Sequence, residues 1–242
     1  MNMKLKIGIM AAAAALVALS SCASKPAAKE TAVAEPKKLC ALTFDDGPDI
    51  EKTALVLDKL DAYGVKATFF VVGQLLSEDT ADLAKRMAEA GHEFGNHSWG
   101  WESLNEKSPA DIRASLDKTA AAIQQYTGQT PHFFRPPNLA TSEVLFAEAG
   151  LPFAGGVLGM DWAGCGTSAE DRAANVLKGM RDGAIVLLHD VQPYPHPTPE
   201  ALDILIPELL AQGYELVTLS ELFARKGVTP DPREEIMWTY VE

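Results

Sequence analysis

Positive charge is scarce in this sequence. Its 242 residues include 21 Lys and Arg against 33 Asp and Glu, which gives a formal net charge of -12 and a pI near 4.9. Because a polyanion is bound through clustered cations, we exclude nucleic acid as an expected partner. The sequence also has no internal repeat and no glycine-rich phosphate loop, and the second absence argues against an open dinucleotide-binding sheet.

No hydrophobic run is long enough to cross a membrane. A spanning helix needs about 20 consecutive apolar residues, whereas the run over residues 7–19 is shorter and ends in two serines. With two lysines before it, residues 1–21 have the layout of a secretory signal peptide. The sequence Leu19-Ser20-Ser21-Cys22 resembles the bacterial lipoprotein signal. This resemblance implies an exported protein that is held in the cell envelope, facing the periplasm or the cell surface, by acyl chains on Cys22.

The segment after the signal has almost no large apolar side chains. Residues 22–38 are rich in Ala, Lys, Glu and Pro, so we expect a flexible tether. Residues 39–242 are sufficient for one core, and we expect one catalytic domain and a monomeric protein.

Cysteine is also rare. If Cys22 carries lipid, only Cys40 and Cys165 remain. An exported location permits a disulfide between them, but the sequence does not fix their separation. A disulfide between Cys40 and Cys165 and a pair of free buried thiols are therefore both open alternatives.

From Leu39 onward, short β-branched and apolar segments alternate with segments of helical spacing. One helix has a clear start at Ser108, Pro109 and Asp111, and Thr198 is expected to cap a later helix. The alternation predicts an α/β fold, a distorted (β/α) barrel of about seven parallel strands in a single domain. The candidate strands are residues 41–44, 65–72, 93–96, 132–135, 151–155, 157–161, 184–188 and 214–218.

Ionisable side chains recur at one kind of position, at or just beyond the C-terminal end of a predicted strand. In a βα barrel these strand ends form the active face. Filling of the core would not place so many charged groups at equivalent points, so we expect them to meet in one pocket. The residues are Asp45, Asp46, His97, Arg135, Asp161 and His189.

The first of these positions lies in the sequence Thr43-Phe44-Asp45-Asp46-Gly47-Pro48. Its composition alone is also typical of an acidic turn. Two adjacent carboxylates can nevertheless divide metal binding and proton transfer between them. Four further motifs follow in order: His97-Ser98, Arg135-Pro136-Pro137, Asp161-Trp162 and Leu187-Leu188-His189.

Together these motifs resemble the signatures of the polysaccharide deacetylases, the NodB-like family of carbohydrate esterases (family 4). The similarity extends over residues 41–223. It implies that Asp45 is the general base and His189 the general acid. It also implies that Arg135 orients Asp45 and that Asp161 tunes His189.

The same resemblance implies a divalent metal on Asp46 and His97, with zinc first and cobalt, nickel or manganese as alternatives. The sequence departs from the family at Trp101, where a second histidine is usual four residues after the first. Indole has an N–H donor but no available lone pair, so it cannot bind a metal, and fewer protein ligands remain than a catalytic zinc site usually has. Three readings stay open: another group completes the site, water fills the position, or metal binding and catalysis have been lost. The candidate third ligands are Glu102, Asn105, His92 and His196.

Further residues are predicted to contact the substrate. The resemblance places Trp162 and Leu187 in an acetyl pocket, beside Pro136 of the third motif. Trp99 offers a flat apolar surface on which a sugar ring could stack, although core packing explains it equally well. Asn138-Leu139 stands where relatives commonly carry an aromatic residue or glycine, which would alter the substrate groove.

We therefore predict a hydrolase of carbon–nitrogen bonds other than peptide bonds. It would remove N-acetyl groups from an envelope or extracellular polysaccharide, such as peptidoglycan or a polymer of N-acetylglucosamine. The alternatives are an esterase for O-acetyl groups of xylan or other carbohydrates, and an envelope-anchored carbohydrate-binding protein with impaired catalysis. A glycosidase is disfavoured because its two carboxyl groups must flank a bond at about 5 Å or more, and Asp45 and Asp46 are adjacent.

Overall fold

The computed structural model of the protein describes residues 37–162 and 167–242. The predicted signal peptide, Cys22, the tether up to residue 36 and Cys165 lie outside the described residues. Lipid anchoring and the Cys40–Cys165 alternatives therefore stay predictions. Cys40 is fully buried, and burial raises the pKa of its thiol to about 12. Among the described residues, no helix is both long enough and apolar enough to span a bilayer.

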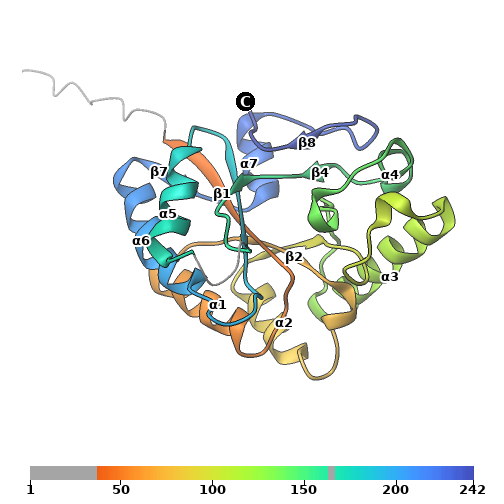
Figure 1. The fold of residues 1–242 in the computed structure, drawn as a ribbon, viewed down its shortest axis with the longest axis horizontal. Helices are drawn as coiled ribbons and strands as arrows, with labels where there is room; N and C mark the ends of the chain where they lie inside the picture. Colours follow the sequence, from red (N-terminus) through yellow and green to blue (C-terminus); the bar gives the residue numbers. More distant parts are fainter. Residues whose placement is uncertain (1–36, 163–166) are drawn as a thin grey trace, which may run out of the picture. The chain divides into compact units, whose positions relative to one another are not determined.

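Strands and helices alternate along the described residues, with the strands inside and the helices around them (Figure 1). The strands are β1 (Lys38–Asp45), β2 (Thr68–Val71), β3 (Glu93–Asn96), β4 (Phe153–Ala154), β5 (Val157–Leu158), β6 (Ala184–His189), β7 (Tyr214–Leu216) and β8 (Met237–Trp238). The helices are α1 (Lys52–Tyr63), α2 (Ala81–Glu89), α3 (Pro109–Thr127), α4 (Glu143–Ala149), α5 (Ala169–Lys178), α6 (Thr198–Ala211) and α7 (Leu219–Lys226). Short 3-10 helices occupy Gly73–Leu75, Leu104–Glu106 and Pro137–Leu139.

The sheet is organised around β1, and its pairings are parallel. One edge of β1 pairs with β6 along most of its length. The other edge pairs with β7 near the start of β1 and with β2 near its end. Strand β3 lies beyond β2, and β5 lies beyond β6. Parallel pairing brings the C-terminal ends of these strands to one edge of the sheet.

The ring closes through single-residue bridges and the C-terminal segment. Phe134 pairs with Asn96 of β3 and with Phe153 of β4, and β4 pairs with β8. Beyond β8, Tyr240 pairs antiparallel with Ala184 at the start of β6. Backbone pairing therefore runs once around the domain, and the predicted distorted (β/α) barrel is confirmed.

The alternation of side chains along the strands separates two regions of the core. On β1, Cys40, Leu42 and Phe44 belong to the large cluster beneath the helices. Leu39 and Ala41 belong to a second cluster on the opposite face, inside the barrel. Because successive side chains of a strand point to opposite faces, the inner face of β1 ends in a polar residue, Asp45.

Two predictions of the chain's course need correction. The predicted strand 132–135 is reduced to a bridge at Phe134, made with the help of the carbonyl of Phe133 and the N–H of Arg135. The two prolines after Arg135 cannot donate ladder hydrogen bonds, so the pairing stops there. Thr198 is the first residue of α6 and not its cap, and its hydroxyl makes no capping hydrogen bond. The Ser108 cap of α3 is confirmed, since its side chain accepts from the backbone N–H of Asp111. Strand β8 and helix α7 were not foreseen.

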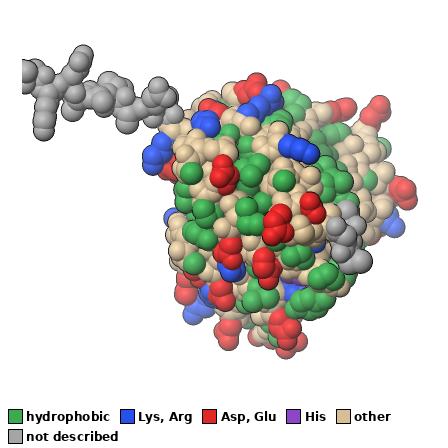
Figure 2. All heavy atoms as spheres, turned by 60° about the vertical axis from the view of Figure 1, so that its left-hand side comes forward, with side chains coloured by type: hydrophobic (Ala, Val, Ile, Leu, Met, Phe, Trp, Pro, Cys, Tyr) green, Lys and Arg blue, Asp and Glu red, His purple; other side chains and the backbone are tan. Residues whose placement is uncertain are grey.

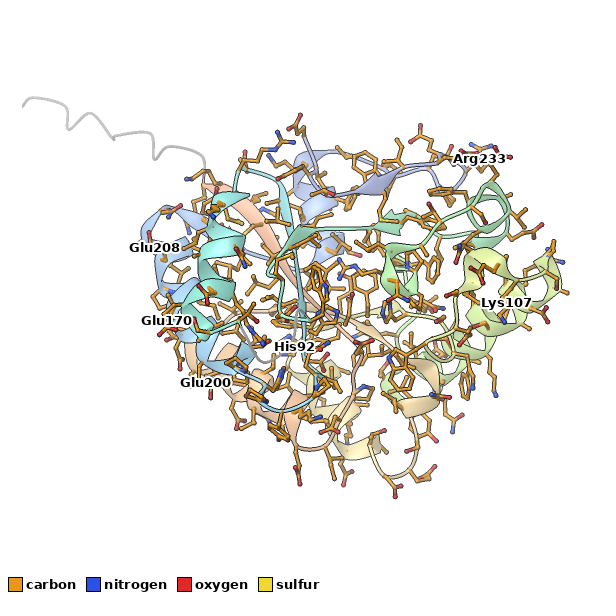
Figure 3. All side chains as sticks on the ribbon, in the orientation of Figure 1. His92, Lys107, Glu170, Glu200, Glu208 and Arg233 are labelled. Atoms are coloured by element: carbon orange, nitrogen blue, oxygen red, sulfur yellow. The ribbon has the colours of Figure 1, made fainter. Side chains whose placement is uncertain are left out.

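Acidic side chains are distributed over the surface. On the face shown in Figure 2, red carboxylates lie scattered among hydrophobic and neutral side chains. Glu170 of α5 and Glu200 and Glu208 of α6 are exposed and lie on the left-hand side in Figure 3, the side that Figure 2 turns forward. These acidic side chains of the helices are thus exposed to solvent.

We predict that closure by the C-terminal segment depends on Gly183. Its φ is +86°, and a Cβ there would lie 2.0 Å from the carbonyl oxygen of Val241. Gly183→Ala should lower the free energy of unfolding by about 3 kcal/mol or more, because a left-handed backbone and overpacking both oppose it. Gly64→Ala is the matched control, since Gly64 has φ +64° but no atom within 4 Å of its Cβ position. It should lose only about 1 kcal/mol in urea denaturation, and equal losses in the two variants would contradict the steric role of Val241.

Candidate active site

Strand register brings the first and last motifs side by side. Asp45, the last residue of β1, is the direct partner of His189, the last residue of β6. Both residues continue the inner faces of their strands, on which Ala41 and Ile185 lie deeper in the barrel. The predicted base and the predicted acid therefore meet at the C-terminal edge of the barrel.

Asp45 is held by a buried arginine. Arg135 is 0% exposed and Asp45 3%, and Nη1 of Arg135 donates to Oδ1 of Asp45 at 2.6 Å. The other guanidinium nitrogens, Nε and Nη2, donate to the carbonyl oxygens of Ala154 at 2.9 Å and Gly155 at 2.6 Å. The guanidinium also lies over the ring of Phe70, 4.1 Å from its centroid. The carboxylate of Asp45 is thus fixed in orientation and compensated in charge.

His189 is held by a buried carboxylate. Its Nδ1 lies 2.8 Å from Oδ1 of Asp161, and its backbone N–H donates to Oδ2 of Asp161 at 2.6 Å. Burial disfavours the imidazolium, but the hydrogen bond and charge of Asp161 outweigh it and raise the pKa of His189 to about 9. His189 is therefore protonated at neutral pH, as a general acid must be before it reacts.

Asp46 and His97 lie together on the other side of the pocket. Nδ1 of His97 is 2.6 Å from the carbonyl oxygen of Arg135, which can only accept, so Nδ1 carries a hydrogen, and Nε2 is the ring nitrogen left to donate to Asp46 or to bind a cation. That Nε2 is 3.6 Å from Oδ1 of Asp46. The same Oδ1 accepts a hydrogen bond from Nε1 of Trp101 at 2.8 Å. Burial raises the pKa of Asp46, but His97 and His189 more than offset this and the pKa is lowered.

The donor pair of Asp46 and His97 fits a divalent cation. A separation of 3.6 Å allows both atoms to contact one ion at about 2.0–2.2 Å. Trp101 occupies the place of a third donor with an N–H group, which can orient Asp46 but cannot bind the ion. In the described part of the chain no group of three or more His, Cys, Asp or Glu residues is arranged to hold a metal.

None of the four candidate third ligands lines the pocket. Glu102 accepts from Ser115, and His92 is buried at the opposite end of β3, where its Nδ1 accepts from the N–H of Ala67. Asn105 and His196 each have buried polar side-chain atoms without a partner among the described residues. Burial, reinforced by the charge of Arg172, lowers the pKa of His196. Among the described residues, completion of the site by one of these four side chains therefore finds no support.

The site is a pocket of about 330 Å³. Of the predicted substrate contacts, Trp162, Leu187 and Pro136 line it, whereas Trp99 does not. The ring of Trp99 packs against the core beneath the helices, and the ammonium group of Lys118 lies 3.6 Å from its centroid. Trp101 is 50% exposed and Trp162 42%, so both present aromatic surface at the pocket.

Other residues of the site were missed or only partly foreseen. Leu158, the last residue of β5, and Gln192, which follows β6, line the pocket without a sequence signal beyond these positions. Asn138 and Leu139, noted as a departure from the family, also line it and have φ values of 58° and 54°. Asp46 has φ 79°. Left-handed backbone at non-glycine residues is uncommon, and such strain collects at functional sites.

Known proteins that are similar to this chain include deacetylases and an esterase. The family profile described as polysaccharide deacetylase matches residues 32–152. A "Bifunctional xylanase/deacetylase" of Pseudobutyrivibrio xylanivorans is 42% identical over 206 residues, which cover 85% of this chain and 34% of the relative. The peptidoglycan-N-acetylglucosamine deacetylase PgdA of Listeria monocytogenes is 38% identical over 202 residues, 81% of this chain and 41% of the relative.

This chain thus spans about a third to two fifths of the length of these two relatives. Among solved structures, a family 4 acetyl xylan esterase from Clostridium thermocellum in complex with a cobalt ion is similar over nearly its whole length. The TM-score is 0.83 and the identity 58%, with 84% of this chain and 99% of that chain covered.

We predict that Trp101→His raises the affinity for zinc at least tenfold, because an imidazole at this position supplies a third donor beside Asp46 and His97. Isothermal titration of the metal-stripped protein measures it. Trp101→Phe is the control, because it also removes the indole N–H but adds no donor, so its zinc affinity should not rise. A gain of the same size in both variants would show that loss of the indole, and not a new ligand, is responsible.

Proposed function

Because this chain belongs to the polysaccharide deacetylase family, we propose that it hydrolyses acetyl groups on a polysaccharide, with O-acetylated xylan as the first substrate class. One observation carries the proposal. Two groups suited to acid–base chemistry, Asp45 supported by Arg135 and His189 supported by Asp161, face one pocket that also contains the donor pair of Asp46 and His97. A base, an acid and a cation site in one pocket are the requirements of hydrolysis without a covalent intermediate.

Asp45 is the base in this proposal. Its carboxylate accepts from Arg135 through Oδ1, which leaves Oδ2 to take a proton from an attacking water. Arg135 also compensates the charge of this carboxylate, since its Nη1 lies 2.6 Å from Oδ1. Asp46 and His97 would hold a divalent cation, which when bound polarises the acetyl carbonyl and lowers the pKa of water.

His189 is the acid. With Nδ1 directed at Asp161, its Nε2 is directed towards the pocket, 4.0 Å from Oδ2 of Asp46. The proton on Nε2 passes to the leaving oxygen of the sugar as the carbon–oxygen bond breaks. Trp162, whose ring lies edge-on to that of His189, and Leu187 both line the pocket and form the apolar wall against which the acetyl methyl group packs.

The choice of an ester rests on similarity and on reactivity. The acetyl xylan esterase of Clostridium thermocellum is 58% identical, and the bifunctional relative also combines deacetylase and xylanase in its name. An ester carbonyl is intrinsically more electrophilic than an amide carbonyl. Esters therefore suit a site in which the protein supplies only two metal donors and an indole N–H occupies the third place.

The second candidate is N-deacetylation of peptidoglycan or another N-acetylglucosamine polymer. It is supported by the 38% identity to the Listeria peptidoglycan deacetylase. The raised pKa of His189, about 9, also suits an amine leaving group, which must be protonated before it departs.

We further propose that the enzyme is exported and held at the cell envelope by acyl chains on Cys22. The support is the signal-like layout of residues 1–21 and the Leu19-Ser20-Ser21-Cys22 sequence. A tether would then let the domain reach a polymer outside the membrane.

Asp45→Asn should lower kcat/KM for acetate release by about 10²- to 10⁴-fold, because asparagine keeps the shape but cannot accept the proton. Acetate is measured from acetylated xylan, N-acetylglucosamine oligomers and peptidoglycan, with the protein metal-stripped and then resupplied with zinc or cobalt. Metal should restore activity in the wild type only, and release from acetylated xylan should be fastest. Faster release from the N-acetylated polymers would favour the second candidate. The absence of acetate from every polymer in both metal states would instead support a carbohydrate-binding protein.

Cys22→Ala should abolish labelling of the expressed full chain by radioactive palmitate and move the protein from the membrane fraction to the soluble one. Cys40→Ala is the matched control, because Cys40 is buried in β1 and should not affect labelling. Labelling that persists in Cys22→Ala would overturn the lipid anchor.

A further inference from the structure

A buried chain of hydrogen bonds continues behind the Asp161–His189 pair. The hydroxyl of Thr198 lies 3.1 Å from Oδ2 of Asp161. Nη1 of Arg172 lies 2.8 Å from the same hydroxyl. Thr198 is 0% exposed, and Arg172 and Asp161 are each 1% exposed, so solvent does not compete for these contacts.

The hydrogen bonds of this series can be donated in only one direction. A guanidinium can only donate and an ionised carboxylate can only accept. Thr198 must therefore accept from Arg172 and give its single proton to Asp161, whose other oxygen accepts from His189. The series runs Arg172 to Thr198 to Asp161, and it ends at the imidazole.

Thr198 has no competing task in its own helix. It is the first residue of α6, and no side-chain capping hydrogen bond is made at this end of the helix. Arg172 comes from α5, where its Nε also lies 3.3 Å from the hydroxyl of Thr167. Two helices are thus joined at the carboxylate of a third segment, the loop after β5.

From this arrangement we infer that Thr198 is a positioning residue, which with Arg172 fixes the Asp161 carboxylate so that His189 presents its Nε2 proton to the leaving group. The inference rests on the proposed hydrolysis and deepens it by assigning support for the acid. Without the Thr198 hydroxyl, the backbone N–H of His189 is the one donor to Oδ2 of Asp161 that remains among the described residues. Arg172 then has no hydrogen-bonded connection through Thr198 to Asp161, and the Asp161 carboxylate can rotate about its Cβ–Cγ bond.

The test compares leaving groups. An acetylated xylooligosaccharide has a poor leaving alcohol that needs a proton, whereas 4-nitrophenyl acetate releases a phenolate that needs none. Thr198→Val, which removes the hydroxyl at constant shape, should lower kcat on the sugar ester about tenfold or more and leave the activated ester within about twofold. Thr198→Ser should restore the sugar activity. Thr119→Val is the matched control, since Thr119 is also 0% exposed and donates to a backbone carbonyl within α3.

A double-mutant cycle separates positioning from a general loss of structure. If Thr198 acts through Asp161, Thr198→Val should cost nothing further in the Asp161→Asn background. Equal losses on both esters, or independent losses in the cycle, would overturn the inference.

A spectroscopic readout does not depend on activity. The Nδ1 proton of His189, hydrogen-bonded to Asp161, should give a downfield proton resonance that shifts or broadens in Thr198→Val and is unchanged in Thr119→Val. An unchanged resonance in Thr198→Val would contradict positioning. A wild type that releases no acetate from sugars would refute the proposed hydrolysis, while this resonance would still decide the role of Thr198.

Discussion

The buried contact between Arg135 and Asp45 is the interaction on which the rest of the site depends. A fully buried guanidinium is costly to desolvate unless its charge is paired and its hydrogens are bonded. Here Asp45 supplies the charge, and the carbonyl groups of Ala154 and Gly155 accept hydrogen bonds from Nε and Nη2. These carbonyls belong to the part of the barrel that is closed by the two-residue strand β4 and by single-residue bridges. The same contact therefore orients the proposed base and joins β1 to the segment at β4.

The second pair is built on the same principle with the charges exchanged. At Asp45 an acidic group acts and a cation supports it, whereas at His189 a cationic group acts and the carboxylate of Asp161 supports it. Each acting group is directed at the pocket and each supporting group is buried behind it. A proposed base and a proposed acid are thereby held at one pocket, which acid–base hydrolysis needs.

Trp101 shows how one substitution changes the task of a position. In place of a lone pair, the indole offers an N–H that meets Oδ1 of Asp46. The carboxylate remains oriented while the protein contributes two donors to a cation in place of three. The half-exposed ring adds apolar surface at the mouth of the pocket, where a sugar ring can pack. A weaker hold on the cation and a larger carbohydrate surface are both compatible with polysaccharide ester hydrolysis.

The sequence by itself determined the fold class and most of the site. Strand and helix periods, together with charged residues at the ends of strands, predicted a barrel and a shared pocket. Asp45, His97 and His189 line that pocket, whereas Arg135 and Asp161 lie buried behind it. These signals are local, since they depend on the side chains within a few residues of each strand end. Only the tertiary structure showed that Phe134 pairs alone, that residues 237–241 close the ring, and that Trp99 packs in the core while Trp101 meets Asp46. It also showed that Thr198, expected to be a helix cap, donates its hydroxyl hydrogen to Asp161, 37 positions away. Such contacts join segments far apart in the chain, and no periodicity within either segment encodes the distance between them.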